Sequence, residues 1–75
     1  MKMAYPYWEK EWRQLGIGDA IRLVADEFDG KTVLDAVVTE ISKDHALAKT
    51  DDGIVLWLDD FTDQSVTLTL YKLAF

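Results

Sequence analysis

The segment that most constrains this chain runs from residue 50 to residue 60, where five apolar residues are enclosed by pairs of aspartates. Its sequence is Thr-Asp-Asp-Gly-Ile-Val-Leu-Trp-Leu-Asp-Asp. An uninterrupted apolar run of this length, bounded by turn residues, is typical of a strand buried on both faces. We therefore expect Ile54–Leu58 to be a strand that the rest of the chain covers.

Side chains along a strand alternate between its two faces, so the five residues divide into two sets. Ile54, Leu56 and Leu58 share one face and are the candidates for the core. Trp57 then points to the opposite face of the sheet, either beneath another element or into solvent. Its orientation decides whether this aromatic ring is part of the fold or part of a binding surface.

A chain of 75 residues predicts one domain. It contains no cysteine, which excludes disulfides and thiolate metal sites. Its hydrophobic fraction of 49% is too high for a disordered chain. The longest apolar run is far shorter than a membrane span, and the first residues lack the apolar core of a signal peptide. We expect a cytoplasmic protein with no membrane association and no cofactor.

Residues 5–16 have the pattern of a short helix. Pro6 suits the first helical position and Gly16 suits the residue after the last turn. Four side chains at spacings of three and four share one face, namely Tyr5, Trp8, Trp12 and Leu15. We expect residues 1–16 to form an aromatic helix packed on a β-domain of residues 17–75. Its aromatic side chains either cover that domain or remain outside as a docking surface.

From residue 17 onward the apolar residues recur every second position, which predicts strands joined by tight turns. The expected strands are Ala20–Phe28, Thr32–Ile41, Ala46–Lys49, Ile54–Leu58 and Ser65–Phe75. The apolar face of the second strand changes partway along, which favours a bend or bulge near Ala36–Val38. Asp29-Gly30 and Asp51-Asp52-Gly53 are hairpin turns. Residues 59–64 form a loop or a single helical turn.

Several short motifs resemble those of SH3-like small barrels of the KOW and Tudor type. The opening strand Gly18-Asp19-Ala20-Ile21-Arg22-Leu23 is similar to the strands that begin such barrels, and the turns at Asp29-Gly30 and Asp51-Asp52-Gly53 are similar to theirs. The resemblance covers residues 17–75. It implies a mainly β fold, an SH3-like five-stranded small barrel with a short N-terminal α-helix. A five-stranded OB-like barrel is the alternative fold.

Residue types suited to catalysis or metal binding do not form a recognisable motif. Ser42, Asp44 and His45 are the right types for a nucleophile set, but three neighbours on one turn rarely converge as separated elements do. Residues 59–63 offer carboxylates without the alternating spacing of a calcium loop. We expect neither an enzyme nor a metal site.

The charge pattern indicates the kind of partner. Eight basic residues stand against fourteen acidic ones, a net charge of −6. Binding of the phosphate backbone requires a basic footprint, so no direct nucleic-acid binding is expected. Between Asp44 and Asp63 six aspartates are opposed only by Lys49, and a second acidic group lies between Asp26 and Asp29. A basic protein surface is the natural partner of such a chain.

These observations lead to a first hypothesis, a non-enzymatic protein-interaction module. It binds through exposed aromatic residues, and its acidic loops guide the encounter. The aromatic candidates are Tyr7, Trp8, Trp12, Trp57 and Tyr71, and the acidic candidates are Asp51, Asp52, Asp59, Asp60 and Asp63.

The alternative hypothesis is a phage-type inhibitor of a host or defence nucleic-acid enzyme. In that case the aspartate-rich loops act as a partial DNA mimic in a basic channel, as in anti-CRISPR or anti-restriction proteins. Exposed strand edges also permit a homodimer formed by edge-to-edge pairing.

Overall fold

The computed structural model describes residues 7–73, in which six strands and two short helices follow one another. The strands are β1 (Tyr7–Glu9), β2 (Ala20–Glu27), β3 (Gly30–Ile41), β4 (Ala46–Thr50), β5 (Val55–Leu58) and β6 (Leu68–Leu73). The helices are the 3-10 helix η1 (Trp12–Gln14) and the α-helix α1 (Asp60–Gln64). The prediction of a mainly β fold is confirmed.

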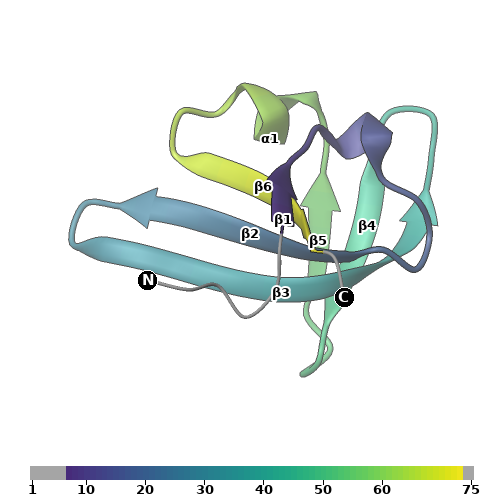
Figure 1. Cartoon of the computed structure of the whole chain (residues 1–75), viewed down its shortest axis with the longest axis horizontal. Coiled ribbons are helices and arrows are strands. Elements are labelled where there is room, and N and C mark those ends of the chain that lie inside the picture. The colour runs from purple at the N-terminus through teal and green to yellow at the C-terminus, as the bar shows by residue number, and fades with distance from the viewer. Residues whose placement is uncertain (1–6, 74–75) are drawn as a thin grey trace.

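All six strands belong to one antiparallel sheet with the order β1-β6-β2-β3-β4-β5. The last strand therefore returns to pair with β2, the first strand of the long β2–β3 hairpin. Figure 1 shows β4 and β5 running steeply across the direction of this hairpin. Within residues 7–73, β1 and β5 are the two edges and do not pair with each other, so the sheet is open.

The strong bend of the sheet lies within β3. The register shifts between Val38, which lies opposite Ala48, and Glu40, which lies opposite Leu47. Thr39 is the additional residue, and a bulge of this kind bends its strand. The bend predicted near Ala36–Val38 is thus confirmed, displaced by about one residue. The shift places Ile41 opposite the buried Ala46, on the same face of the sheet as Val38 and Ala48, whereas regular alternation would have placed Ile41 on the face of Val37.

The helix predicted over residues 5–16 is wrong for the part of it that the structure describes. Residues 7–9 form β1, which pairs with β6 through Tyr7 opposite Leu73 and Glu9 opposite Tyr71. Only the single 3-10 turn η1 is helical. An isolated helix of about ten residues is marginal in water, so pairing with a sheet edge outweighs the local helical pattern.

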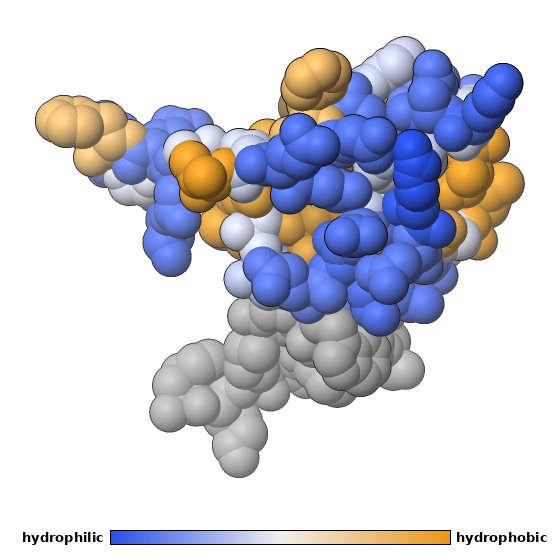
Figure 2. All heavy atoms as spheres, turned by 90° about the horizontal axis from the view of Figure 1, so that it is seen from above, coloured by the Kyte–Doolittle hydropathy of each residue, from blue (hydrophilic) through white to orange (hydrophobic). Residues whose placement is uncertain are grey.

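The β2–β3 hairpin ends in a tight turn at Phe28 and Asp29, one residue earlier than the Asp29-Gly30 turn that the sequence predicts. Gly30 has a positive φ of 152°, a conformation that a side chain disfavours. Phe28 at the tip is fully exposed. Figure 1 shows the hairpin projecting to the left of the molecule, and Figure 2 shows apolar side-chain atoms at that end.

The core lies on the inner face of the bent sheet, and η1 contributes to it from one side. Its largest fully buried side chains are Trp12, Ile21, Leu58 and Val38. Leu15, which follows η1, and Leu70 on β6 belong to the same core cluster. On β4 the core residues are the small side chains Ala46 and Ala48. Of the three core candidates predicted on β5, Leu56 and Leu58 face inward as expected, whereas Ile54 is exposed.

The prediction that Ile54–Leu58 is buried on both faces is wrong. β5 is an edge strand, and only its inner face is covered. Leu58 is fully buried and Leu56 packs partly against the core, whereas Ile54 and Val55 are exposed. An apolar run does not reveal whether its second face meets another layer, and here it does not.

Candidate protein-binding surface

The outer face of the β4–β5 hairpin carries exposed apolar and aromatic side chains. Leu56 and Leu58 occupy the inner face of β5, so Val55 and Trp57 point outward. Ile54 precedes them at the start of the strand and is also exposed. We call Ile54, Val55 and Trp57, together with His45 beside them, the Trp57 surface.

Trp57 is exposed but held in place. Its side chain is 59% exposed. The indole stacks on the ring of His45, with 3.8 Å between centroids and 9° between planes. The indole Nε1–H donates to Asp59 Oδ2 at 3.0 Å. An aromatic ring fixed by two contacts loses little conformational entropy when a partner covers it.

His45 links this ring to a carboxylate at the surface. Its Nδ1 lies 2.8 Å from Asp44 Oδ1, and the Asp44 carboxylate is largely exposed. The hydrogen bond from His45 holds the pKa of Asp44 below its usual value, partly opposed by the desolvation of the carboxyl group. A negative charge is therefore retained beside the Trp57 surface.

Two more carboxylates lie at the other end of β5, in the β4–β5 turn. Asp51 and Asp52 are both exposed. Asp52 Oδ1 accepts a hydrogen bond of 2.6 Å from the Thr50 hydroxyl, which fixes the turn. Lys49 lies opposite Val55 in the β4–β5 register. The predicted acidic loop is thus present next to the Trp57 surface.

The remaining predicted aspartates have partners inside the fold. Asp59 caps α1 by accepting from the amides of Phe61 and Thr62 at 3.0 and 3.2 Å. Asp60 accepts from Trp12 Nε1 at 2.8 Å and pairs with Arg13 at 3.2 Å. These carboxylates hold α1 and η1 in place, a role that the sequence did not indicate.

The predicted aromatic residues are placed differently from one another. Trp12 is 2% exposed and belongs to the core, with the Arg13 guanidinium 4.6 Å from its ring centroid. Tyr71 is half-buried on β6. Tyr7 and Trp8 lie in β1, and their side chains are outside the described part of the structure. Of the five, Trp57 alone has a side chain described as exposed.

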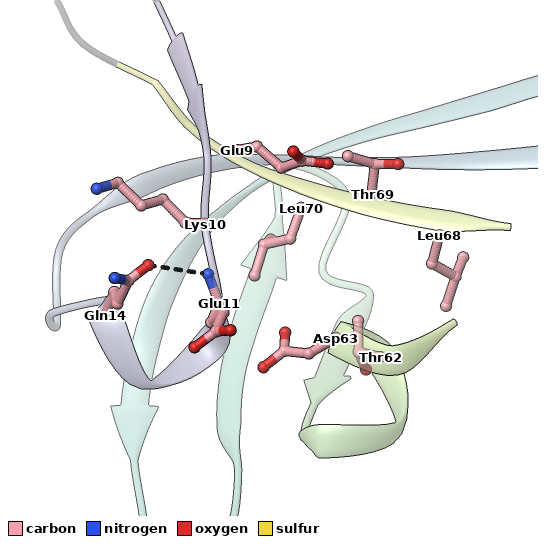
Figure 3. A pocket seen from close by; sticks show the side chains of 9 residues that line it. All are labelled: Glu9, Lys10, Glu11, Gln14, Thr62, Asp63, Leu68, Thr69 and Leu70. Carbon is pink, nitrogen blue, oxygen red and sulfur yellow. Dashed lines mark hydrogen bonds between the residues drawn. The ribbon is translucent and has the colours of Figure 1, made fainter. Parts of the chain in front are cut away.

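A polar cleft of about 430 Å³ separates η1 from α1 and β6 (Figure 3). Its lining comprises Glu9, Lys10, Glu11, Gln14, Thr62, Asp63, Leu68, Thr69 and Leu70. Asp63 accepts from the backbone amide of Trp12 through both oxygens at 3.2 Å. Burial raises the pKa of Asp63, and the charges of Glu11 and Asp60 add to this, against the lowering effect of the Trp12 hydrogen bond. No local signal could predict the cleft, because its walls come from distant segments.

The side chains considered for a nucleophile set have other partners. The Ser42 hydroxyl donates to Glu40 Oε2 at 3.3 Å, while His45 is engaged by Asp44 and Trp57. Among residues 7–73 no three histidine, aspartate or glutamate side chains lie together as a metal site would require. No helix in this part of the chain is long and apolar enough to cross a membrane.

Comparison with known proteins gives no match: no family model fits the chain, and neither a curated protein nor a solved structure is significantly similar to it.

Proposed function

We propose that this chain is a non-enzymatic protein-interaction module that binds a basic partner through the Trp57 surface. The observation that carries the proposal is Trp57 itself, an exposed indole fixed by the His45 ring and by Asp59. Tryptophan is among the residues most enriched at the energetic centres of interfaces. Because the ring is already held in one orientation but is not buried within the chain, its apolar surface is available to a binding partner.

The charges around this ring indicate the chemistry of the partner. Asp44 lies beside His45, and Asp51 and Asp52 lie at the far end of β5. Three exposed carboxylates around an apolar centre suit a surface that carries lysine or arginine around an apolar pocket. Such complementarity increases the association rate and selects against acidic competitors.

An SH3-like assignment of the fold is part of the proposal. It is supported by the strand order β6-β2-β3-β4-β5, in which the final strand pairs with the first strand of the meander, and by the single helical turn α1 before that final strand. The bulge in β3 supports it as well. In this arrangement β1 is an additional strand outside the five-stranded unit.

The experiment is affinity capture from a lysate of the source cells with the immobilised chain. The wild type is compared with a Trp57→Ala variant and with a Phe28→Ser variant, which removes a still more exposed aromatic ring at the hairpin tip. Proteins that depend on the Trp57 surface disappear with Trp57→Ala and remain with Phe28→Ser. If Trp57→Ala captures the same proteins as the wild type, the proposed surface is wrong.

The second candidate is an inhibitor whose aspartates mimic nucleic acid in a basic channel, and the exposed carboxylates Asp44, Asp51 and Asp52 favour it. It is the weaker candidate because Asp59, Asp60 and Asp63 are engaged within the fold. The two differ in salt dependence. A complex that forms by charge alone weakens steeply between low and high salt, whereas one centred on Trp57 keeps much of its affinity.

A further inference from the structure

The backbone of β5 has one side without a partner strand among residues 7–73. The Thr50 amide donates to the Ile54 carbonyl at 2.9 Å. Since inter-strand hydrogen bonds in an antiparallel pair involve every second residue, Leu56 and Leu58 direct their backbone groups toward β4. The N–H and C=O groups of Val55 and Trp57 therefore point away from β4, along the outer edge of the sheet.

We propose that the partner adds an extended segment to this edge as a seventh strand of the sheet. The inference builds on the proposed function, because the added strand lies beside Val55 and the Trp57 ring. Main-chain hydrogen bonds to Val55 and Trp57 provide the pairing, and alternate side chains of the segment contact the exposed indole.

A second free edge shows why β5 is the better site. β4 pairs with β3 only from Ala36 onward, so the outer half of β3 also lacks a neighbour on one side. There Lys31 and Asp35 flank Val33, and they form ion pairs with Asp26 and Arg22 across the hairpin. Charged residues on an edge oppose strand addition. β5 has no charged residue between Val55 and Leu58.

The charges at the two ends of β5 specify the segment. Asp51 and Asp52 precede the strand, and the exposed carboxylate of Asp44, beside the His45 ring that stacks on Trp57, lies near its other end. Four strand residues span about 13 Å at 3.3 Å per residue. A complementary segment has an apolar or β-branched centre of about four residues with lysine or arginine on both sides. Because both ends of β5 are acidic, such a segment fits in either direction.

A second copy of the chain fits this edge less well. Antiparallel pairing of β5 with another β5 places the start of one strand beside the end of the other. The Asp51–Asp52 pair of one chain then lies near the exposed Asp44 of its neighbour at both ends of the contact. Like charges facing each other across strands are destabilising. The acidic ends therefore favour a basic segment of a different protein.

The test is selection of a displayed library of random twelve-residue peptides on the full-length chain. The proposal predicts enrichment of alternating β-branched or aromatic residues with lysine or arginine at both ends. Binding of the enriched peptides should protect the amides of Val55 and Trp57 from hydrogen exchange. If no such pattern is enriched, or if the enriched peptides protect other residues, strand addition at β5 is wrong.

Two proline variants separate edge pairing from side-chain contact. Proline is tolerated on an edge strand where its missing N–H faces away from the sheet. Val55→Pro removes one edge donor and should weaken the selected peptides about tenfold. Val33→Pro is the matched control: the Val38 amide donates to the Asp19 carbonyl, which by alternation directs the Val33 N–H away from β2. It should leave binding unchanged, and circular dichroism verifies that both variants fold.

The two proposals can fail separately. If Trp57→Ala abolishes capture of cellular proteins and Val55→Pro has no effect on it, the Trp57 surface binds but the edge does not pair. If neither variant affects capture, both proposals fall. Equal weakening of the selected peptides by Val55→Pro and Val33→Pro would show a general effect of proline and would overturn the edge assignment.

Discussion

Two tryptophans in this chain make the same polar contact in opposite environments. Trp12 donates its indole N–H to Asp60, and Trp57 donates its indole N–H to Asp59, the preceding residue. Trp12 is 2% exposed and fills the space between η1 and the sheet, while Trp57 is 59% exposed on the outer face of β5. Both are therefore fixed, but only one of them uses its apolar surface within the fold.

The same indole–carboxylate hydrogen bond therefore has two roles in this fold: it stabilises a buried contact at Trp12 and orients an exposed ring at Trp57. At Trp12 the carboxylates of Asp60 and Asp63, both on α1, accept hydrogen bonds from the indole N–H and the backbone N–H of Trp12. They thereby connect η1 to α1. At Trp57 the carboxylate and His45 orient a ring that remains in solvent. An aromatic ring that is ordered and still exposed is better evidence of a binding surface than exposure alone.

The largest effect on stability is expected from Trp12→Ala. This substitution removes the largest fully buried side chain and leaves a cavity beneath η1. We expect the free energy of unfolding to fall by about 3–5 kcal/mol, enough to unfold much of so small a domain. Urea unfolding followed by circular dichroism measures the loss. A loss below about 1 kcal/mol would mean that Trp12 is not part of the core.

Trp57→Ala should have a small effect on stability and a large effect on partner binding. The variant loses the His45 stack and the Asp59 hydrogen bond, both at the surface, so the free energy of unfolding should change by about 1 kcal/mol or less. Affinity for a captured partner should fall by about 2 kcal/mol or more, as for an interface hot spot. Calorimetric titration of the partner measures this loss. Trp57→Phe keeps a ring on His45 and should restore part of the affinity.

Asp59→Ala tests a residue that both stabilises the fold and orients the Trp57 ring. Its carboxylate caps α1 through the amides of Phe61 and Thr62 and also holds the Trp57 indole. Loss of the cap should lower the free energy of unfolding by about 1 kcal/mol. Asp59→Asn keeps capping ability and serves as the control. If Asp59→Ala is as stable as Asp59→Asn in chemical denaturation, the cap contributes nothing.

The Trp12 junction predicts a pH dependence through Asp63. Its pKa is raised above the usual 3.8 in the folded chain, so protonation of this carboxyl favours folding. Its contribution to the free energy of unfolding is complete below the unfolded pKa and is lost as the pH rises through the folded pKa. Relative to the wild type, Asp63→Asn should therefore gain stability as the pH rises from about 4 to about 7.

Comparison of thermal unfolding of the two proteins across this range isolates Asp63. The pKa of Asp35 is lowered by its hydrogen bond from Arg22, so its contribution is present above the usual pKa and is lost as the pH falls through the lowered value. The contribution of Asp35 is the same in the wild type and in Asp63→Asn, so it cancels when the stabilities of the two proteins are subtracted. A constant difference between wild type and Asp63→Asn at every pH would contradict the raised pKa.

The smallest effect is expected from Phe28→Ser. Phe28 is fully exposed at the tip of the β2–β3 hairpin, where neither the turn nor the core needs an aromatic ring. The free energy of unfolding should stay within about 0.5 kcal/mol of the wild type, and partner binding should be unchanged. A large loss of partner affinity in the same titration would show that the interface lies at the hairpin tip and not at β5.

Local patterns in the sequence predicted most of the strands. Period-two alternation located β2 to β4, and the bounded apolar run located β5. The glycine-containing turns located the hairpins to within a residue, and the change of apolar face in the second strand located the bulge near Val38. The opposite facing of Leu56 and Trp57 also followed from alternation. These features depend on neighbours in the chain, so the sequence carries them directly.

The errors arise where distant segments meet. The spacing of Trp8 and Trp12 suits a helix, but residues 7–9 pair with the edge of β6 instead, and Trp12 lies in the separate 3-10 turn η1. The apolar run of β5 resembles a doubly buried strand, and nothing local shows that it lies at the end of the sheet. Asp63 and Trp12 are 51 residues apart, so their contact had no signal in the sequence.

Residue-specific amide hydrogen exchange of the free chain tests the open edge of β5 most directly. The account predicts alternation along the strand: slow exchange at Leu56 and Leu58, whose amides bond to β4, and fast exchange at Val55 and Trp57, whose amides face outward. A basic-flanked peptide selected on the chain should then slow exchange at Val55 and Trp57 alone. Equal protection of all four amides in the free chain would show that the edge is already covered, and would contradict the account.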